Sequence, residues 1–121
     1  MITEDYASFE IARLLRIRGF DEECDRVYTP QGYMHVQFGN NYMLAAQYCS
    51  APTIQKAKKW LRMNYGLHIG VILTYDNPRK YEAHINHVDN CNDIILCPDE
   101  GFSSDEEAIE AGIKYCLENL I

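Results

Sequence analysis

The spacing of apolar residues changes from helical to strand-like within the central stretch of the chain, residues 50–75. In its first half, apolar side chains recur every three or four residues, the period of a helix that buries one face. In its second half they alternate with other residues, the period of a strand with one strongly apolar face. We therefore predict a helix that has Thr53 as its N-cap, ends at Gly66 and leads directly into a strand. The helical positions are Ile54, Ala57, Leu61 and Tyr65, and the alternating positions are Leu67, Ile69, Val71 and Leu73.

A second apolar helix is predicted near the start of the chain, over residues 6–17, with Thr3 as its N-cap and Gly19 as its stop. Its apolar residues cover much of the helix circumference. A helix of this kind is either buried on two sides or used in an interface with another molecule. We take Phe9 and Leu15 as candidate interface residues for self-association.

The next segment has the composition of a hairpin. Two runs of β-forming residues, 27–29 and 33–38, flank the turn residues Pro30 and Gly32. In the second run every other residue is apolar, which predicts one face in the core and one wetter face. The predicted core residues are Met34, Val36 and Phe38. Residues 42–49 fit a strand and an irregular segment equally well.

The remaining elements complete a mixed fold. Residues 81–88 are predicted as an antiparallel return strand and residues 94–97 as a short internal strand. A last helix follows Ser104, whose spacing to Glu107 is that of a capping box. The predicted order is α-β-β-α-β-β-β-α. Its simplest packing is a two-layer α+β fold, with an antiparallel sheet and helices on one face, in a single domain of residues 1–121.

The composition limits the classes to which the protein can belong. Apolar residues make up 47% of the chain and charged residues 24%, which is typical of a globular protein. No apolar run approaches the roughly 18–20 residues of a membrane span. The acidic start, MITEDYASFE, lacks the pattern of a secretory signal. The five cysteines are odd in number and form no CxxC pair, which favours free thiols. We expect a cytoplasmic protein that does not associate with membranes.

The net charge of −7 disfavours binding to nucleic acid, but the charges are unevenly distributed. Residues 26–75 contain no acid, whereas residues 67–121 contain three cations and eleven acids. Lys56, Lys59 and Arg62 lie at helical spacing on the predicted central helix and form a basic face. One alternative function is therefore weak, salt-sensitive binding of nucleic acid, or a regulatory role, through this face.

The sequence offers little catalytic chemistry. His84, His87, Cys91 and Cys97 form its densest group of potential metal ligands, and zinc binds such side chains in tetrahedral sets. However, His84 and His87 differ by three positions, which places them on opposite faces of a strand. A small zinc-binding protein, or a thiol enzyme that uses Cys91, is a further alternative. No glycine-rich nucleotide motif and no HExxH motif occurs. We predict no catalytic residue and no cofactor.

Three segments carry a resemblance to a known family: SFEIARLLRIRGFDEECDRVYTPQG, SAPTIQKAKKWLRMNYGLHIGV and DEEAIEAGIKYCLENLI. They resemble a family of small uncharacterised proteins carried by anaerobic gut bacteria, their prophages and mobile elements. The resemblance covers about half of the chain. It implies a phage-type or mobile-element accessory protein that is cytoplasmic in its host, and it assigns no chemistry to any residue.

Together these features favour a non-enzymatic protein-interaction domain. The expected partner is a second copy of the chain or a host or phage protein. This hypothesis depends on the widely apolar first helix, the uneven charge and the lack of a catalytic motif.

Overall fold

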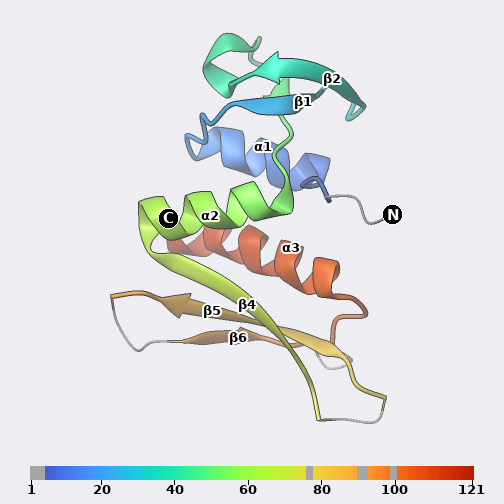
Figure 1. Ribbon diagram of the computed structural model, residues 1–121, viewed down its shortest axis with the longest axis vertical. Helices are drawn as coiled ribbons and strands as arrows, with labels where there is room; N and C mark the ends of the chain where they lie inside the picture. Colours follow the sequence, from blue (N-terminus) through green and yellow to red (C-terminus); the bar gives the residue numbers. More distant parts are fainter. Residues whose placement is uncertain (1–4, 76–77, 90–92, 99–100) are drawn as a thin grey trace. The chain divides into compact units, whose positions relative to one another are not determined.

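The computed structural model describes residues 5–75, 78–89, 93–98 and 101–121. The chain forms two compact units, residues 1–57 and 58–121 (Figure 1). The three helices and the antiparallel strands confirm the α+β class, and the order of the main elements matches the predicted one. None of the described helices is both long and apolar enough to cross a membrane. The single-domain organisation stays a prediction.

The first unit contains one helix and a three-stranded antiparallel sheet in the order β2-β1-β3. Its elements are α1 (Phe9–Ile17), β1 (Cys24–Tyr28), β2 (Met34–Gly39), a 3₁₀ turn (Asn41–Met43) and β3 (Cys49–Ser50). The hairpin of β1 and β2 is confirmed, with Tyr28 opposite Met34. The undecided segment 42–49 is mostly irregular and ends in the short strand β3, which pairs with β1.

Helix α1 starts later than predicted. Its N-cap is Ser8, whose hydroxyl accepts a hydrogen bond from the Ile11 amide at 3.3 Å. Tyr6 lies instead in an isolated antiparallel bridge with Thr53, an extended arrangement that excludes the predicted first turn. Thr3, the predicted N-cap, is outside the described residues.

The end of α1 confirms the predicted glycine stop. Gly19 has a φ of +93°, the left-handed conformation that glycine adopts without strain. Its amide donates to the Arg16 carbonyl at 3.1 Å, and the Phe20 amide donates to the Leu15 carbonyl at 2.9 Å. This pair of bonds is a Schellman motif, and the buried Phe20 is the apolar residue that accompanies such motifs.

A small cluster of side chains packs α1 onto β1 and β3. Tyr28 donates a hydrogen bond to the Ala7 carbonyl at 2.6 Å, and its ring lies 5.4 Å from that of Phe9. The cluster consists of Ala12, Tyr28, Cys49 and Ala51, with Tyr6 and Phe9 packed against it. Strand β2 contributes nothing to this cluster. Its predicted core residues Met34, Val36 and Phe38 are exposed, so that prediction was wrong. The physical reason is that α1 packs on side chains of β1 and β3, through the contacts with Tyr28 and Cys49, and β2 is the edge strand beyond them.

The second unit contains a three-stranded antiparallel sheet in the order β4-β5-β6, covered by a helix. Its strands are β4 (Leu67–Leu73), β5 (Tyr81–His87) and β6 (Ile94–Leu96), and its helix is α3 (Asp105–Tyr115), continued by a π-helical turn (Cys116–Leu120). The buried residues of α3 and of this turn are Ala108, Ile109, Gly112, Ile113, Cys116 and Leu117, whereas Leu120, at the end of the same apolar stripe, is half-buried. Gly112 allows a close approach, since a Cβ there would lie 2.8 Å from Cγ2 of Ile69.

Helix α2 (Ile54–Tyr65) runs from the first unit into the second and confirms both predicted ends. The Thr53 hydroxyl accepts a hydrogen bond from the Lys56 amide at 3.2 Å. Gly66, with a φ of +68°, donates to the Arg62 carbonyl at 3.1 Å. Tyr65 departs from the prediction, because it is exposed and its ring lies against that of Trp60.

Two predictions about the second sheet were wrong. Leu73 belongs to the strongly apolar face predicted for this strand but is exposed, since burial of that face declines from Leu67 towards the end of β4. Residues 94–97 were expected to form an internal strand, but among the described residues β6 pairs only with β5 and so lies at an edge of the sheet. The strands also belong to two sheets, whereas the simplest packing placed them in one.

Candidate functional site

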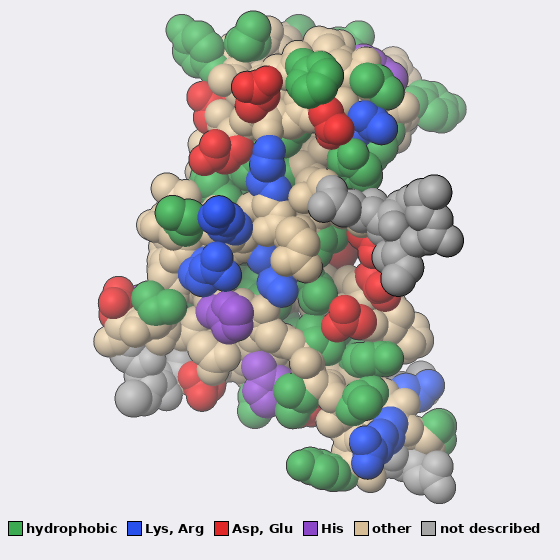
Figure 2. Space-filling model, in the orientation of Figure 1, with side chains coloured by type: hydrophobic (Ala, Val, Ile, Leu, Met, Phe, Trp, Pro, Cys, Tyr) green, Lys and Arg blue, Asp and Glu red, His purple; other side chains and the backbone are tan. Residues whose placement is uncertain are grey.

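The most distinctive surface of the first unit is a group of exposed apolar side chains on β2, on the residue before it and on the turn that follows it (Figure 2). We call it the β2 surface. Its members and their exposed fractions are Tyr33 73%, Met34 38%, Val36 66%, Phe38 72%, Tyr42 88% and Met43 74%. Residues 33–43 contain no Asp, Glu, Lys or Arg. An apolar and uncharged surface of this kind is characteristic of a site that contacts another molecule.

The backbone of β2 adds a second feature to this surface. In the order β2-β1-β3, β2 forms an edge, and within the described residues no strand pairs with its outer side. An unpaired edge presents amide and carbonyl groups that can bond to a further strand. Natural edge strands are usually protected by lysine, proline or very short length. Residues 34–39 contain neither lysine nor proline, whereas β3 at the other edge has only two residues.

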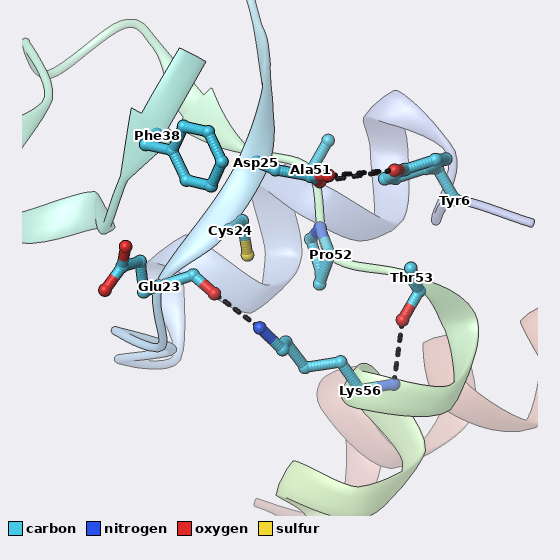
Figure 3. Close-up of a pocket in the computed structure, with 9 residues that line it drawn as sticks. All are labelled: Tyr6, Glu23, Cys24, Asp25, Phe38, Ala51, Pro52, Thr53 and Lys56. Carbon is cyan, nitrogen blue, oxygen red and sulfur yellow. Dashed lines mark hydrogen bonds between the residues drawn. The ribbon is translucent and has the colours of Figure 1, made fainter. Parts of the chain in front are cut away.

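A hollow of about 560 Å³ lies beside β2 in the first unit (Figure 3). Phe38 forms part of its wall, and the Lys56 side chain reaches across it to donate a hydrogen bond to the Glu23 carbonyl at 2.5 Å. The Tyr6 hydroxyl donates to an oxygen of Asp25 at 3.2 Å. The full lining is Tyr6, Glu23, Cys24, Asp25, Phe38, Ala51, Pro52, Thr53 and Lys56.

The chemistry of this hollow does not suit nucleophilic catalysis. Burial raises the pKa of the Cys24 thiol, so the thiol stays protonated at neutral pH. The Lys56 ammonium is already bonded to a backbone carbonyl. A thiol nucleophile needs a lowered pKa or an adjacent base, and histidine is not among the residues that line the hollow.

The residues of the predicted basic face are all exposed on α2. Figure 2 shows Lys and Arg side chains gathered over this helix. Lys56 lies in the first unit, where its side chain donates a hydrogen bond to the Glu23 carbonyl. Lys59 and Arg62 are exposed in the second unit, where they could contact an anionic partner. Binding through this face stays a prediction.

The two predicted interface residues of α1 lie in different environments. Leu15 is fully buried and therefore cannot contact a partner in this structure. Phe9 is half-buried at the edge of a second hollow, of about 500 Å³. Arg13 lies over its ring, 5.5 Å from the ring centre, while Arg16 donates to the carbonyls of residues 44 and 48 at 3.2 and 2.5 Å. These α1 side chains thus make contacts within their own unit.

The predicted ligand group is only partly described. His84 and His87 lie on opposite faces of β5, as expected from their spacing. Nε2 of His84 lies 2.9 Å from Oε1 of Glu82, and Nδ1 of His87 accepts a hydrogen bond from the Asp89 amide at 3.2 Å. Cys97 is exposed. Cys91 falls outside the described residues, and within the described ranges no three metal-ligating side chains gather.

Sequence reasoning missed the β2 surface. The alternation of Met34, Val36 and Phe38 predicts two different faces, but it does not say whether anything covers the apolar one. A signal was nevertheless present, since the intervening residues Tyr33, His35 and Gln37 include no acid and no lysine or arginine. A strand with one solvent face usually carries charges there.

Comparison of the chain with known protein families, with curated proteins and with solved structures gave no match.

Proposed function

We propose that the protein is a non-enzymatic protein-interaction domain, an accessory protein of the phage or mobile-element type, that binds a protein partner through the β2 surface. One observation carries the proposal: six large apolar side chains stand exposed within residues 33–43. Exposed apolar surface in water is unfavourable by roughly 25 cal/mol per Å² relative to burial. A partner that covers these side chains would therefore gain binding free energy.

The form of the surface supports a protein as the partner. Its apolar side chains stand on a strand whose outer edge offers backbone amides and carbonyls. A second polypeptide strand can satisfy both features at once, by backbone hydrogen bonds along the edge and by apolar contacts on its faces. Nucleic acid would require cations, and residues 33–43 contain no lysine or arginine. The phage or mobile-element context is supported by the family resemblance of the three sequence segments.

The test is a binding comparison between wild type and the variant Val36→Glu/Phe38→Glu, with Ile72→Glu as a matched control. Ile72 is an exposed apolar residue on β4, an edge strand of the other unit, so it controls for added charge. Each protein is used as bait in an extract of the source organism, and any bound protein is purified and titrated separately.

The expected result is a partner whose affinity falls at least about tenfold in the β2 double variant and is unchanged in Ile72→Glu, a difference of ~1.4 kcal/mol. Equal binding of every captured protein, including the chain itself, to wild type and to the β2 double variant would overturn the proposal.

A further inference from the structure

The hydrogen bonds around β1 fix which backbone groups of β2 point outward. The Thr29 amide donates to the Tyr33 carbonyl at 2.8 Å, so residues 29 and 33 form a hydrogen-bonded pair. Such pairs alternate with non-bonded pairs along an antiparallel ladder. Tyr28 and Met34 are therefore a non-bonded pair, residues 27 and 35 are bonded, and residues 26 and 36 are non-bonded.

The other side of β1 gives an independent check. The Ala51 amide donates to the Arg26 carbonyl at 2.9 Å, so the backbone of Arg26 points towards β3 and away from β2. On β2, the backbone groups of His35 consequently point towards β1, while those of Met34 and Val36 point outward. A shift in register between Cys24 and Arg26 interrupts the ladder beyond Val36. The regular outward groups are thus those of Met34 and Val36.

We infer that the partner is a second copy of this chain, an inference that rests on the proposed function. The β2 strands of the two copies pair antiparallel across a two-fold axis at His35. In this arrangement Met34 bonds to the partner's Val36, and Val36 bonds to the partner's Met34. The pairing uses only the regular part of the strand before the register shift. A two-fold arrangement also places the same surface on both copies, as closed dimers require.

Three properties of the β2 surface favour a second copy. Its lack of lysine, arginine, aspartate and glutamate means that no formally charged pair stands across the axis, despite the net charge of −7. Its six side chains expose on the order of 700 Å², taking about 200 Å² for a free aromatic side chain and less for the others, and this total is the upper bound on what these side chains can give to an interface that takes ~800 Å² from each partner. The opposite edge is the two-residue strand β3, which disfavours extension of the sheet into a fibre from that side.

Sedimentation velocity over a range of concentrations tests the inference. Wild type is expected to form a dimer with a dissociation constant in the micromolar range, on the scale of about 1–100 µM. Val36→Glu should shift the equilibrium at least about tenfold towards monomer, because it places a carboxylate on the joined edge. Ile72→Glu should leave the equilibrium unchanged. Circular dichroism verifies that both variants fold.

Cross-linking tests the position of the axis, with Cys91 and Cys97 replaced by serine. His35→Cys places two thiols directly opposite each other, at a Cα separation of about 4.5 Å that suits a disulfide. Gln37→Cys places them about 13 Å apart along the strand, which prevents one. A disulfide-linked dimer of His35→Cys and none of Gln37→Cys is expected.

The outcomes separate the two proposals. A wild-type protein that stays monomeric up to about 500 µM overturns the second copy as partner, and so does a dimer that survives Val36→Glu or cross-links at residue 37 instead of 35. If wild type stays monomeric but binds a different protein, and Val36→Glu loses that binding, the proposed function stands without the dimer.

Discussion

The Thr29 amide and the Tyr33 carbonyl oxygen are 2.8 Å apart, and this one hydrogen bond sets the direction of the backbone groups along β2. It closes the hairpin, and the alternation of the ladder then directs the backbone of His35 inward and those of Met34 and Val36 outward. The same strand carries exposed apolar side chains. Edge geometry and side-chain chemistry therefore point to the same surface.

The contact between Gly112 and Ile69 predicts a stability effect inside the second unit. A Cβ at Gly112 would lie 2.8 Å from Cγ2 of the buried Ile69. Gly112→Ala should lower the free energy of unfolding by up to about 2 kcal/mol, because an overpacking cost of ~1–3 kcal/mol opposes the ~1 kcal/mol gain in helix propensity. Urea unfolding measures the difference.

Gly70→Ala is the matched control for this variant, since a Cβ at Gly70 meets no atom within 4 Å. Its free energy of unfolding should differ from that of wild type by less than about 1 kcal/mol. If Gly112→Ala proves as stable as Gly70→Ala, the close packing of α3 on β4 is refuted.

The cap of α3 predicts a second, local stability effect. The Ser104 hydroxyl accepts a hydrogen bond from the Glu107 amide at 3.1 Å, while the Glu107 carboxylate accepts one from the Ser103 hydroxyl at 2.5 Å. Ser104→Ala removes the first acceptor and should lower the free energy of unfolding by about 1 kcal/mol. Ser104→Thr keeps a hydroxyl and should cost less. Equal losses in thermal unfolding experiments on the two variants would argue against the cap.

Cys49 predicts a dependence of stability on pH. Burial raises the pKa of its thiol to about 11 from the ordinary value of 9.0, against the smaller opposing effects of Arg16 and Arg13. The folded state therefore holds the proton more tightly than the unfolded state. By linkage, the resulting stabilisation is complete below pH 9 and is lost as the pH rises towards 11, by an amount on the order of 1–3 kcal/mol.

The comparison with Cys49→Ala isolates this effect from other groups that titrate in the same range. The difference in free energy of unfolding between wild type and Cys49→Ala should shrink as the pH rises from 9 to 11. Denaturant titrations at a series of pH values provide the measurement. A constant difference over that range would contradict the assignment of Cys49 as a buried, protonated thiol.

Local signals made much of the fold predictable. Gly19 and Gly66 adopt the left-handed conformations that their positions after apolar helices indicated. Thr53 and Ser104 cap the helices that follow them, as their spacing predicted. These features depend on residues close together in the chain. Their physical cause is that the amides and carbonyls at helix ends have no hydrogen-bond partner within the helix, so nearby residues must supply one.

The features that escaped prediction depend on distant parts of the chain. Ser8 caps α1 in place of Thr3, because a bridge to Thr53 keeps Tyr6 extended. The division of the strands into two sheets depends on which strands pair, which periodicity does not encode. Val36 was predicted in the core but is exposed, because alternation shows which residues share a face and not whether another element covers that face.

Amide hydrogen exchange at single residues tests the central claim most directly. Exchange rates of Met34 and Val36 are compared by NMR at low and high protein concentration, with His35 as an internal reference. If β2 is the surface where two copies pair, exchange at Met34 and Val36 should slow by at least about tenfold at high concentration. His35 should change little, because its amide already bonds to β1. Concentration-independent exchange at both Met34 and Val36 would contradict the pairing of β2 with a second copy.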